Sequence, residues 1–167
     1  MNSESSISPC PSCGAIVPGG RPGCLKLFEE VLVRDYSDFR YGRSHRLLVD
    51  TYSLQHAAEY MRSGKSFAAH LTGICAALEY DNAREINSAV QQWLNGPRAI
   101  EKPALMPPSR YSLTIAEIHA AADPESHHEL VQQWARSVWE AWADCHDLAR
   151  QWIDAATNLN RESANLP

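Results

Sequence analysis

Lysine is scarce in this sequence, and no run of basic residues occurs. Only Lys26, Lys65 and Lys102 are lysines among 15 Lys+Arg, and 20 Asp+Glu give a formal net charge of −5. Proteins that bind the phosphate backbone of a nucleic acid need clustered cations that displace its counterions. The composition therefore argues against a nucleic acid as the partner.

Long apolar segments are also lacking. No stretch approaches the roughly 20 apolar residues that a membrane-spanning helix needs, and residues 1–9 are polar, unlike a secretory signal. The five cysteines are an odd number, which favours reduced thiols over a disulfide framework. We therefore expect a cytoplasmic protein with no membrane partner.

No segment shows the alternating pattern of a strand as strongly as several segments show helical spacing. Apolar residues recur every three or four positions, which is typical of helices that bury one face. Within a length of 167 residues, which suggests one domain, the pattern predicts helices over residues 24–36, 44–62, 65–80, 84–94, 114–121 and 124–157.

These elements predict an all-α fold, a helical bundle of five to six helices with an N-terminal metal-binding knuckle and loop. We expect a single domain over residues 10–157, with flexible tails at 1–9 and 158–167. Within the domain, residues 10–23 hold the knuckle and loop, and the proline-rich residues 97–111 form an extended connector.

The last predicted helix is the longest. Asp123 and Pro124 give it an N-cap carboxylate and a proline at its first position, and a helix to residue 157 would span ~50 Å. That is long for a domain of this size, and Trp139 lies off its apolar stripe. A homodimer formed through this helix is therefore a plausible partner arrangement.

The most specific chemical signal is Cys10-Pro-Ser-Cys13-Gly14. Two cysteines separated by two residues and followed by glycine form a turn that directs both sulfurs at one metal ion, most often zinc. A thioredoxin-type redox motif would need a strand before it and a helix opening at it. The motif lies instead in a Pro/Gly-rich loop, which favours Zn²⁺ over redox chemistry or a plain pair of thiols.

Zinc needs four ligands, so two more must come from elsewhere. Cys24 is one candidate because it opens a helix, where the helix dipole favours a thiolate, although a small apolar role is equally compatible. His56 and His70 are the others. If residues 44–62 and 65–80 form an antiparallel hairpin, these two imidazoles face each other, either as ligands or as a buried hydrogen-bonded pair.

Polar residues surround His56 in the sequence. Asp50, Tyr52 and Gln55 precede it closely, and an oxygen that accepts the second imidazole N–H would fix the tautomer of a metal-binding histidine. We expect this supporting role for them. As an alternative, Asp50 would act as a general base beside an open metal position.

Several strings in the chain resemble an uncharacterised bacterial family. They are Cys10-Pro-Ser-Cys-Gly-Ala, the segment from His45 to His56 with its Val-Asp-x-Tyr-x-x-Gln-His pattern, His70-Leu71, and Trp134-Ala-Arg-Ser-Val-Trp-Glu-Ala-Trp142. The family carries no known activity. The resemblance therefore implies a small cytosolic protein and names no substrate.

The sequence thus favours a small helical protein whose zinc ion is structural and which acts as a protein- or ligand-binding module. One alternative is a metal-dependent, hydrolase-like enzyme with an open zinc site near Asp50, Tyr52 and Gln55. A second is a redox or metal sensor in which oxidation of Cys10 and Cys13 releases the ion.

Overall fold

The computed structural model describes residues 6–104, 108 and 110–164. A two-stranded antiparallel hairpin comes first, formed by β1 (Ile7–Pro9) and β2 (Ile16–Pro18). The helices that follow are α1 (Arg21–Ser37), α2 (Phe39–Gly42), α3 (His45–Gln55), α4 (Ala57–Tyr60), α5 (Gly64–Glu79), α6 (Ala83–Asn95), α7 (Ile115–His119), α8 (Pro124–Ala141), the 3-10 turn η1 (Ala143–Cys145) and α9 (His146–Ala164).

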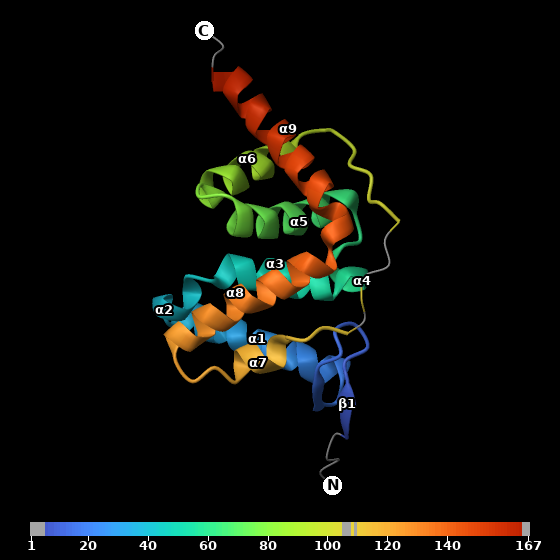
Figure 1. Cartoon of the computed structure of the whole chain (residues 1–167), viewed down its shortest axis with the longest axis vertical. Helices are drawn as coiled ribbons and strands as arrows, with labels where there is room; N and C mark the ends of the chain where they lie inside the picture. The colour runs from blue at the N-terminus through green and yellow to red at the C-terminus, as the bar shows by residue number, and fades with distance from the viewer. Residues whose placement is uncertain (1–5, 105–107, 109, 165–167) are drawn as a thin grey trace.

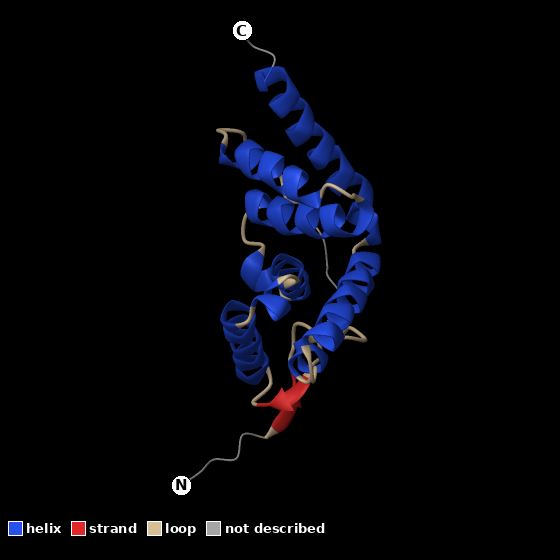
Figure 2. Ribbon diagram, turned by 90° about the vertical axis from the view of Figure 1, so that its left-hand side faces the viewer, coloured by secondary structure: helices blue, strands red, loops and turns tan. Residues whose placement is uncertain are grey.

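The helices form an elongated stack (Figure 1). The hairpin lies at one end beside α1 and α7, α3 and α8 cross the middle, and α5, α6 and α9 form the other end. Figure 2 shows the same order from the side, with the red hairpin at the N-terminal end and α9 reaching toward the C-terminus. One continuous core runs through the stack, and its largest fully buried side chains include Trp134, Tyr52 and Phe67.

The all-α prediction is confirmed, but the described residues form nine α-helices where five to six were expected. One cause is a break at His56, which divides the predicted helix 44–62 into α3 and α4. His56 has the non-helical angles φ −119° and ψ 43°. Its backbone N–H still bonds the carbonyls of Tyr52 and Ser53, so the chain bends without exposing unpaired backbone groups.

A second break divides the predicted 50 Å helix. Trp142 leaves the helical region with φ −103° and ψ 24°, and α9 begins after the short turn η1. His146 Nε2 lies 2.8 Å from the carbonyl oxygen of Trp139 and bonds it across the bend. Trp139 itself is buried, stacked on His146 with ring centroids 3.8 Å apart, so it is not the exposed contact that its sequence position suggested.

The hairpin and α2 were not predicted. Residues 7–9 were expected to belong to a tail, and residues 37–43 lie between two predicted helices. Each strand has only three residues, too few to display an alternating pattern. Residues 1–5 of the expected N-terminal tail lie outside the described residues, and α9 extends to Ala164, into the expected C-terminal tail.

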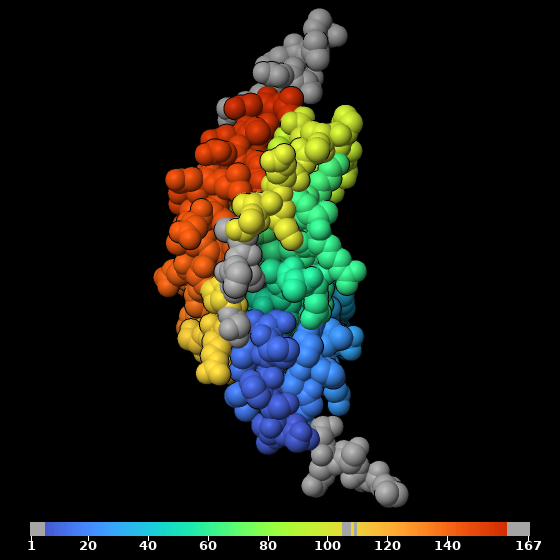
Figure 3. All heavy atoms as spheres, turned by 90° about the vertical axis from the view of Figure 1, so that its right-hand side faces the viewer, coloured from blue at the N-terminus to red at the C-terminus, as the bar shows by residue number. Residues whose placement is uncertain are grey.

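The described part of the proline-rich connector runs along the outside of the stack. In the space-filling view its yellow residues lie on the surface between the orange-red C-terminal helices and the green α5 (Figure 3). Lys102 Nζ donates to the Met61 carbonyl and Lys65 Nζ to the Gly96 carbonyl, which fasten the connector near the start of α5. Among the described helices, none combines the length and apolar character that crossing a bilayer requires.

Candidate metal centre

The tip of the β1–β2 hairpin carries the first two cysteines. The Cys10 N–H donates to the Ala15 carbonyl, and the Gly14 N–H donates to the Cys10 carbonyl, each at 2.8 Å. These bonds close a tight turn, in which Gly14 has a φ of +84°. Glycine adopts this left-handed conformation without steric cost, so the Cys-Gly pair in the motif has a direct structural reason.

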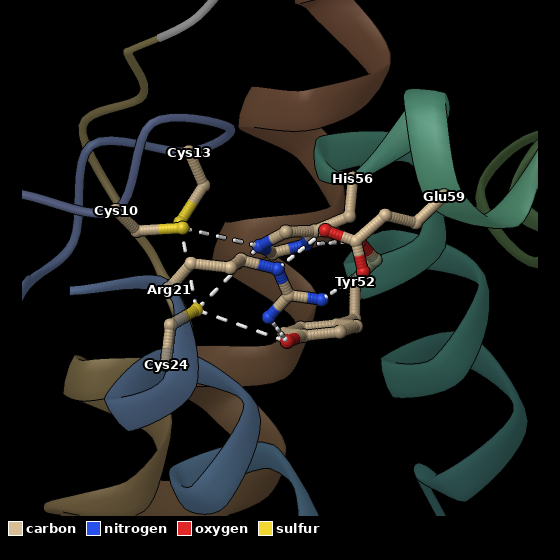
Figure 4. A network of polar contacts seen from close by, with 7 residues as sticks. All are labelled: Cys10, Cys13, Arg21, Cys24, Tyr52, His56 and Glu59. Atoms are coloured by element: carbon tan, nitrogen blue, oxygen red, sulfur yellow. Dashed lines mark hydrogen bonds and ion pairs between the residues drawn. The ribbon is translucent and has the colours of Figure 1, made fainter. Parts of the chain in front are cut away.

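Two further side chains reach the same point from the helices (Figure 4). Cys24 lies in the first turn of α1, which begins directly after the hairpin. His56 occupies the break between α3 and α4. The ligand-type atoms of Cys10, Cys13, Cys24 and His56 all lie within 4.8 Å of one another, and this group could hold a metal ion.

The spacing of these atoms fits tetrahedral coordination. Cys13 Sγ lies 3.8 Å from Cys24 Sγ, and His56 Nε2 lies 3.5 Å from Cys24 Sγ and 3.7 Å from Cys10 Sγ. With Zn–S near 2.3 Å and Zn–N near 2.0 Å, a tetrahedron has S–S edges of ~3.8 Å and S–N edges of ~3.5 Å. All five cysteines are free thiols, so no disulfide competes for the sulfurs.

The Nε2 atom of His56, which faces the cysteine sulfurs, is free to bind a metal. Its Nδ1 lies 2.8 Å from the backbone carbonyl oxygen of Tyr52. A carbonyl only accepts, so Nδ1 carries the proton and donates it, and the lone pair of Nε2 points at the sulfurs. A hydrogen bond of this kind fixes the tautomer and ring orientation of a metal-binding histidine.

One thiol of the cluster is set up for deprotonation. The pKa of Cys24 is lowered to about 4, mainly because the Cys13 thiol donates a hydrogen bond to it. The pKa of Cys13 is raised, because its proton is held in the same hydrogen bond and because the thiol is buried. The cluster therefore favours one thiolate, the form that binds metals.

A network of polar and aromatic side chains supports the cluster from one side (Figure 4). The Tyr52 ring lies between Phe28 and His56, with centroid distances of 3.7 Å and 4.0 Å. Its hydroxyl is 3.8 Å from Cys24 Sγ and accepts a 2.8 Å hydrogen bond from Arg21 Nη1. Arg21 also forms an ion pair with Glu59.

The cluster is closed to solvent. Cys10 is 1% exposed, and Cys13, Cys24 and His56 are each 0% exposed. In the described part of the chain, these four side chains present almost no surface to water. A metal ion held here would have protein atoms on every side, which is the arrangement of structural sites.

Of the residues predicted for the site, His70, Asp50 and Gln55 lie elsewhere. His70 Nδ1 is 2.9 Å from Asp50 Oδ1, while Asp50 Oδ2 accepts from Arg46. Gln55 donates to the Leu113 carbonyl. An unbroken helical hairpin would place His70 opposite His56. The helix breaks after Gln55, however, and His56 faces the cysteines instead. Only Tyr52 among the expected supporting residues touches the cluster.

Sequence reasoning did not find Arg21 or the role of the Tyr52 carbonyl. Arg21 stands three residues before Cys24 in α1, on the same side of the helix, and this spacing was the only available signal. A backbone carbonyl leaves no mark in the sequence, so the acceptor for the His56 ring was sought among side chains.

Comparison with known proteins identifies one family. A model of a family of unknown function, DUF5946, matches residues 8–143, a span that includes all four residues of the cluster. This agrees with the resemblance to an uncharacterised family. No curated protein and no solved structure matches the chain.

Proposed function

The chain belongs to DUF5946, a family of unknown function, and we propose from its candidate metal centre that it is a zinc-stabilised helical binding module. The observation that carries the proposal is the grouping of four buried ligand-type atoms within 4.8 Å of one another, three of whose separations, 3.5, 3.7 and 3.8 Å, match tetrahedral edges. We also propose a cytoplasmic location, because a reducing compartment keeps all five thiols free.

Zinc is the metal that best suits this set of side chains. Three thiolates and one imidazole are soft or borderline ligands, whereas Mg²⁺ and Ca²⁺ prefer oxygen. Three Cys and one His around one ion is a standard composition of structural zinc sites. The contacts of Tyr52 with Cys24 and of Arg21 with Tyr52 hold this side of the cluster in place, which is consistent with a tightly bound structural ion.

The ion would tie together three segments of the chain. Cys10 and Cys13 belong to the hairpin, Cys24 to α1 and His56 to the end of α3. The hairpin buries few apolar side chains of its own, and its Ile7 and Ile16 are exposed. A metal bond therefore supplies stability that packing does not supply at this end of the molecule.

The sequence is also compatible with two other roles. An open-site hydrolase would need a coordination position that water and substrate can reach, and the burial of the cluster favours the structural role. A redox sensor needs accessible thiolates, which the same burial disfavours. A homodimer through the C-terminal helices stays a prediction, and analytical ultracentrifugation of the metal-loaded protein would test it.

Elemental analysis of purified variants tests the proposal. Cys10→Ser and His56→Ala should reduce zinc content from one ion per chain to a small fraction, because each removes a ligand. His70→Ala and Cys145→Ser, which alter a histidine and a buried cysteine outside the cluster, should retain it. Full zinc content in both Cys10→Ser and His56→Ala would refute the assignment.

A further inference from the structure

A hollow with a volume of about 390 Å³ opens where α3, α5, α6 and α8 meet. It lies apart from the cysteine cluster and shares no residue with it. The three charged side chains that line it are all arginines, and its remaining lining is small, apolar or amide-bearing. The lining residues are Arg43, Ser44, Arg46, Leu47, Gly73, Ala77, Ala83, Arg84, Asn87 and Gln132.

Arg46 is held in place by a buried carboxylate. Asp50 is 1% exposed, and its Oδ2 accepts a 2.8 Å hydrogen bond from Arg46 Nε. Its Oδ1 faces His70 Nδ1 at 2.9 Å, so both oxygens of Asp50 are engaged. Among the described residues, Arg46 donates to this carboxylate only through Nε, so its two terminal nitrogens are available to a ligand. A guanidinium held in one orientation can present its planar set of donors to phosphate oxygens.

Gly73 forms part of the floor beneath this arginine. A Cβ at this position would lie 2.1 Å from Asp50 Oδ2 and 3.2 Å from Arg46 Nη2. Any larger residue would therefore displace the carboxylate and the guanidinium together. The glycine allows α5 to approach α3 closely and leaves Arg46 directly above the floor of the hollow.

The other side chains suit an anion that also carries hydroxyl groups. Arg84 is exposed on α6, and Arg43 at the rim pairs with Glu125 at 2.9 Å. Asn87 Oδ1 is buried and has no hydrogen-bond partner among the described residues. An amide oxygen in this state can accept from a ligand hydroxyl, and the Gln132 amide lines the same hollow.

We propose that this hollow binds a phosphate monoester of a small polyhydroxylated molecule, of about the size of a sugar phosphate. One arginine guanidinium can donate two parallel N–H···O hydrogen bonds to a phosphate. The volume of the hollow lies within the range of ~300–1,000 Å³ usual for small-molecule sites. The hollow and the cysteine cluster share no residue. Zinc content and phosphate-ester binding can therefore be measured separately, and either can fail without the other.

Isothermal titration calorimetry of the metal-loaded full chain tests the proposal, with glucose 6-phosphate as the probe and glucose and inorganic phosphate as comparison ligands at constant ionic strength. We expect saturable binding of glucose 6-phosphate, weaker binding of inorganic phosphate, and none of glucose. Arg84→Gln should weaken binding about tenfold, the usual effect of losing one charge-assisted hydrogen bond.

Arg136→Gln provides the matched control, since Arg136 is exposed on α8 and does not line the hollow. It should leave the affinity unchanged, and the melting temperature of each variant shows that it is folded. Equal affinities of Arg84→Gln and Arg136→Gln, or no saturable binding of glucose 6-phosphate, would overturn the proposal. If inorganic phosphate bound as tightly as glucose 6-phosphate, recognition of the ligand hydroxyl groups by the Asn87 and Gln132 amides would be refuted.

Discussion

Withdrawal of the metal ion should lower the thermal stability of the chain markedly and loosen one end of it first. The candidate ligands come from three segments, and Cys10 and His56 are separated by 46 residues. The unfolded chain therefore does not hold the four ligands together, and zinc should bind the folded state almost exclusively. Under that condition the bound ion contributes RT ln(1 + [Zn]/Kd) to the free energy of unfolding.

The size of the effect follows from this relation. At a free zinc concentration of 1,000 times Kd, the contribution is about 4 kcal/mol. In a chain of this length, 1 kcal/mol corresponds to about 2–4 °C in melting temperature. Chelation should therefore lower the melting temperature by about 8–16 °C. Hydrogen exchange should rise first at the Cys10 and Gly14 amides, whose bonds close the knuckle, and remain slow around Trp134.

Differential scanning calorimetry with zinc buffers, followed by hydrogen exchange with mass spectrometry, provides the measurement. Cys24→Ser should show no dependence of melting temperature on zinc, while Cys145→Ser, a buried cysteine outside the cluster, should respond as the unmodified protein does. A shift below about 2 °C on complete removal of zinc, or exchange that rises equally in the knuckle and in α8, would refute the reasoning.

Three further predictions concern single residues. Tyr52→Phe should keep the metal but speed its release to a chromophoric chelator about fivefold, because the hydroxyl near Cys24 is lost, and equal release rates would contradict this. Gly14→Ala should lower stability by about 1–2 kcal/mol through its φ of +84°, whereas Gly96→Ala, at φ −67°, should be near neutral in the same urea titration. Burial and the nearby Arg34 charge lower the pKa of His127 to about 4, so the unfolded chain takes up a proton near pH ~6.5 before the folded chain does, and stability should fall by about 2 kcal/mol from pH 7.5 to about pH 5. His127→Gln should remove that part of the pH dependence, and an unchanged slope would count against it.

The sequence was sufficient for most helices, because their caps and stop signals are local. The Asp123 N-cap forms as predicted, and a Thr114–Glu117 capping box begins the helix that was predicted from residue 114. The bends at His56 and Trp142 were not predictable in the same way. Each bend depends on contacts with distant parts of the chain, and the apolar spacing continues across it without a proline or glycine to mark it.

The cluster of cysteines and one histidine was only partly accessible from sequence. Cys10 and Cys13 are adjacent in a recognisable motif, so their pairing needed no tertiary information. Cys24 and His56 depend on how the hairpin, α1 and α3 come together. His70 was included because an unbroken helical hairpin would have carried it to the same place, and the bend at His56 removes that premise.

The positions of the four candidate ligands along the chain bear on the order of its biosynthesis. All lie within the first 56 residues, so the complete set leaves the ribosome ahead of α5 to α9. Chains emerge from the N-terminus at about 5–20 residues per second, which leaves several seconds in which an ion can join the knuckle, α1 and the end of α3. The nascent segment can thus acquire a covalent-like cross-link ahead of the helices that later cover it.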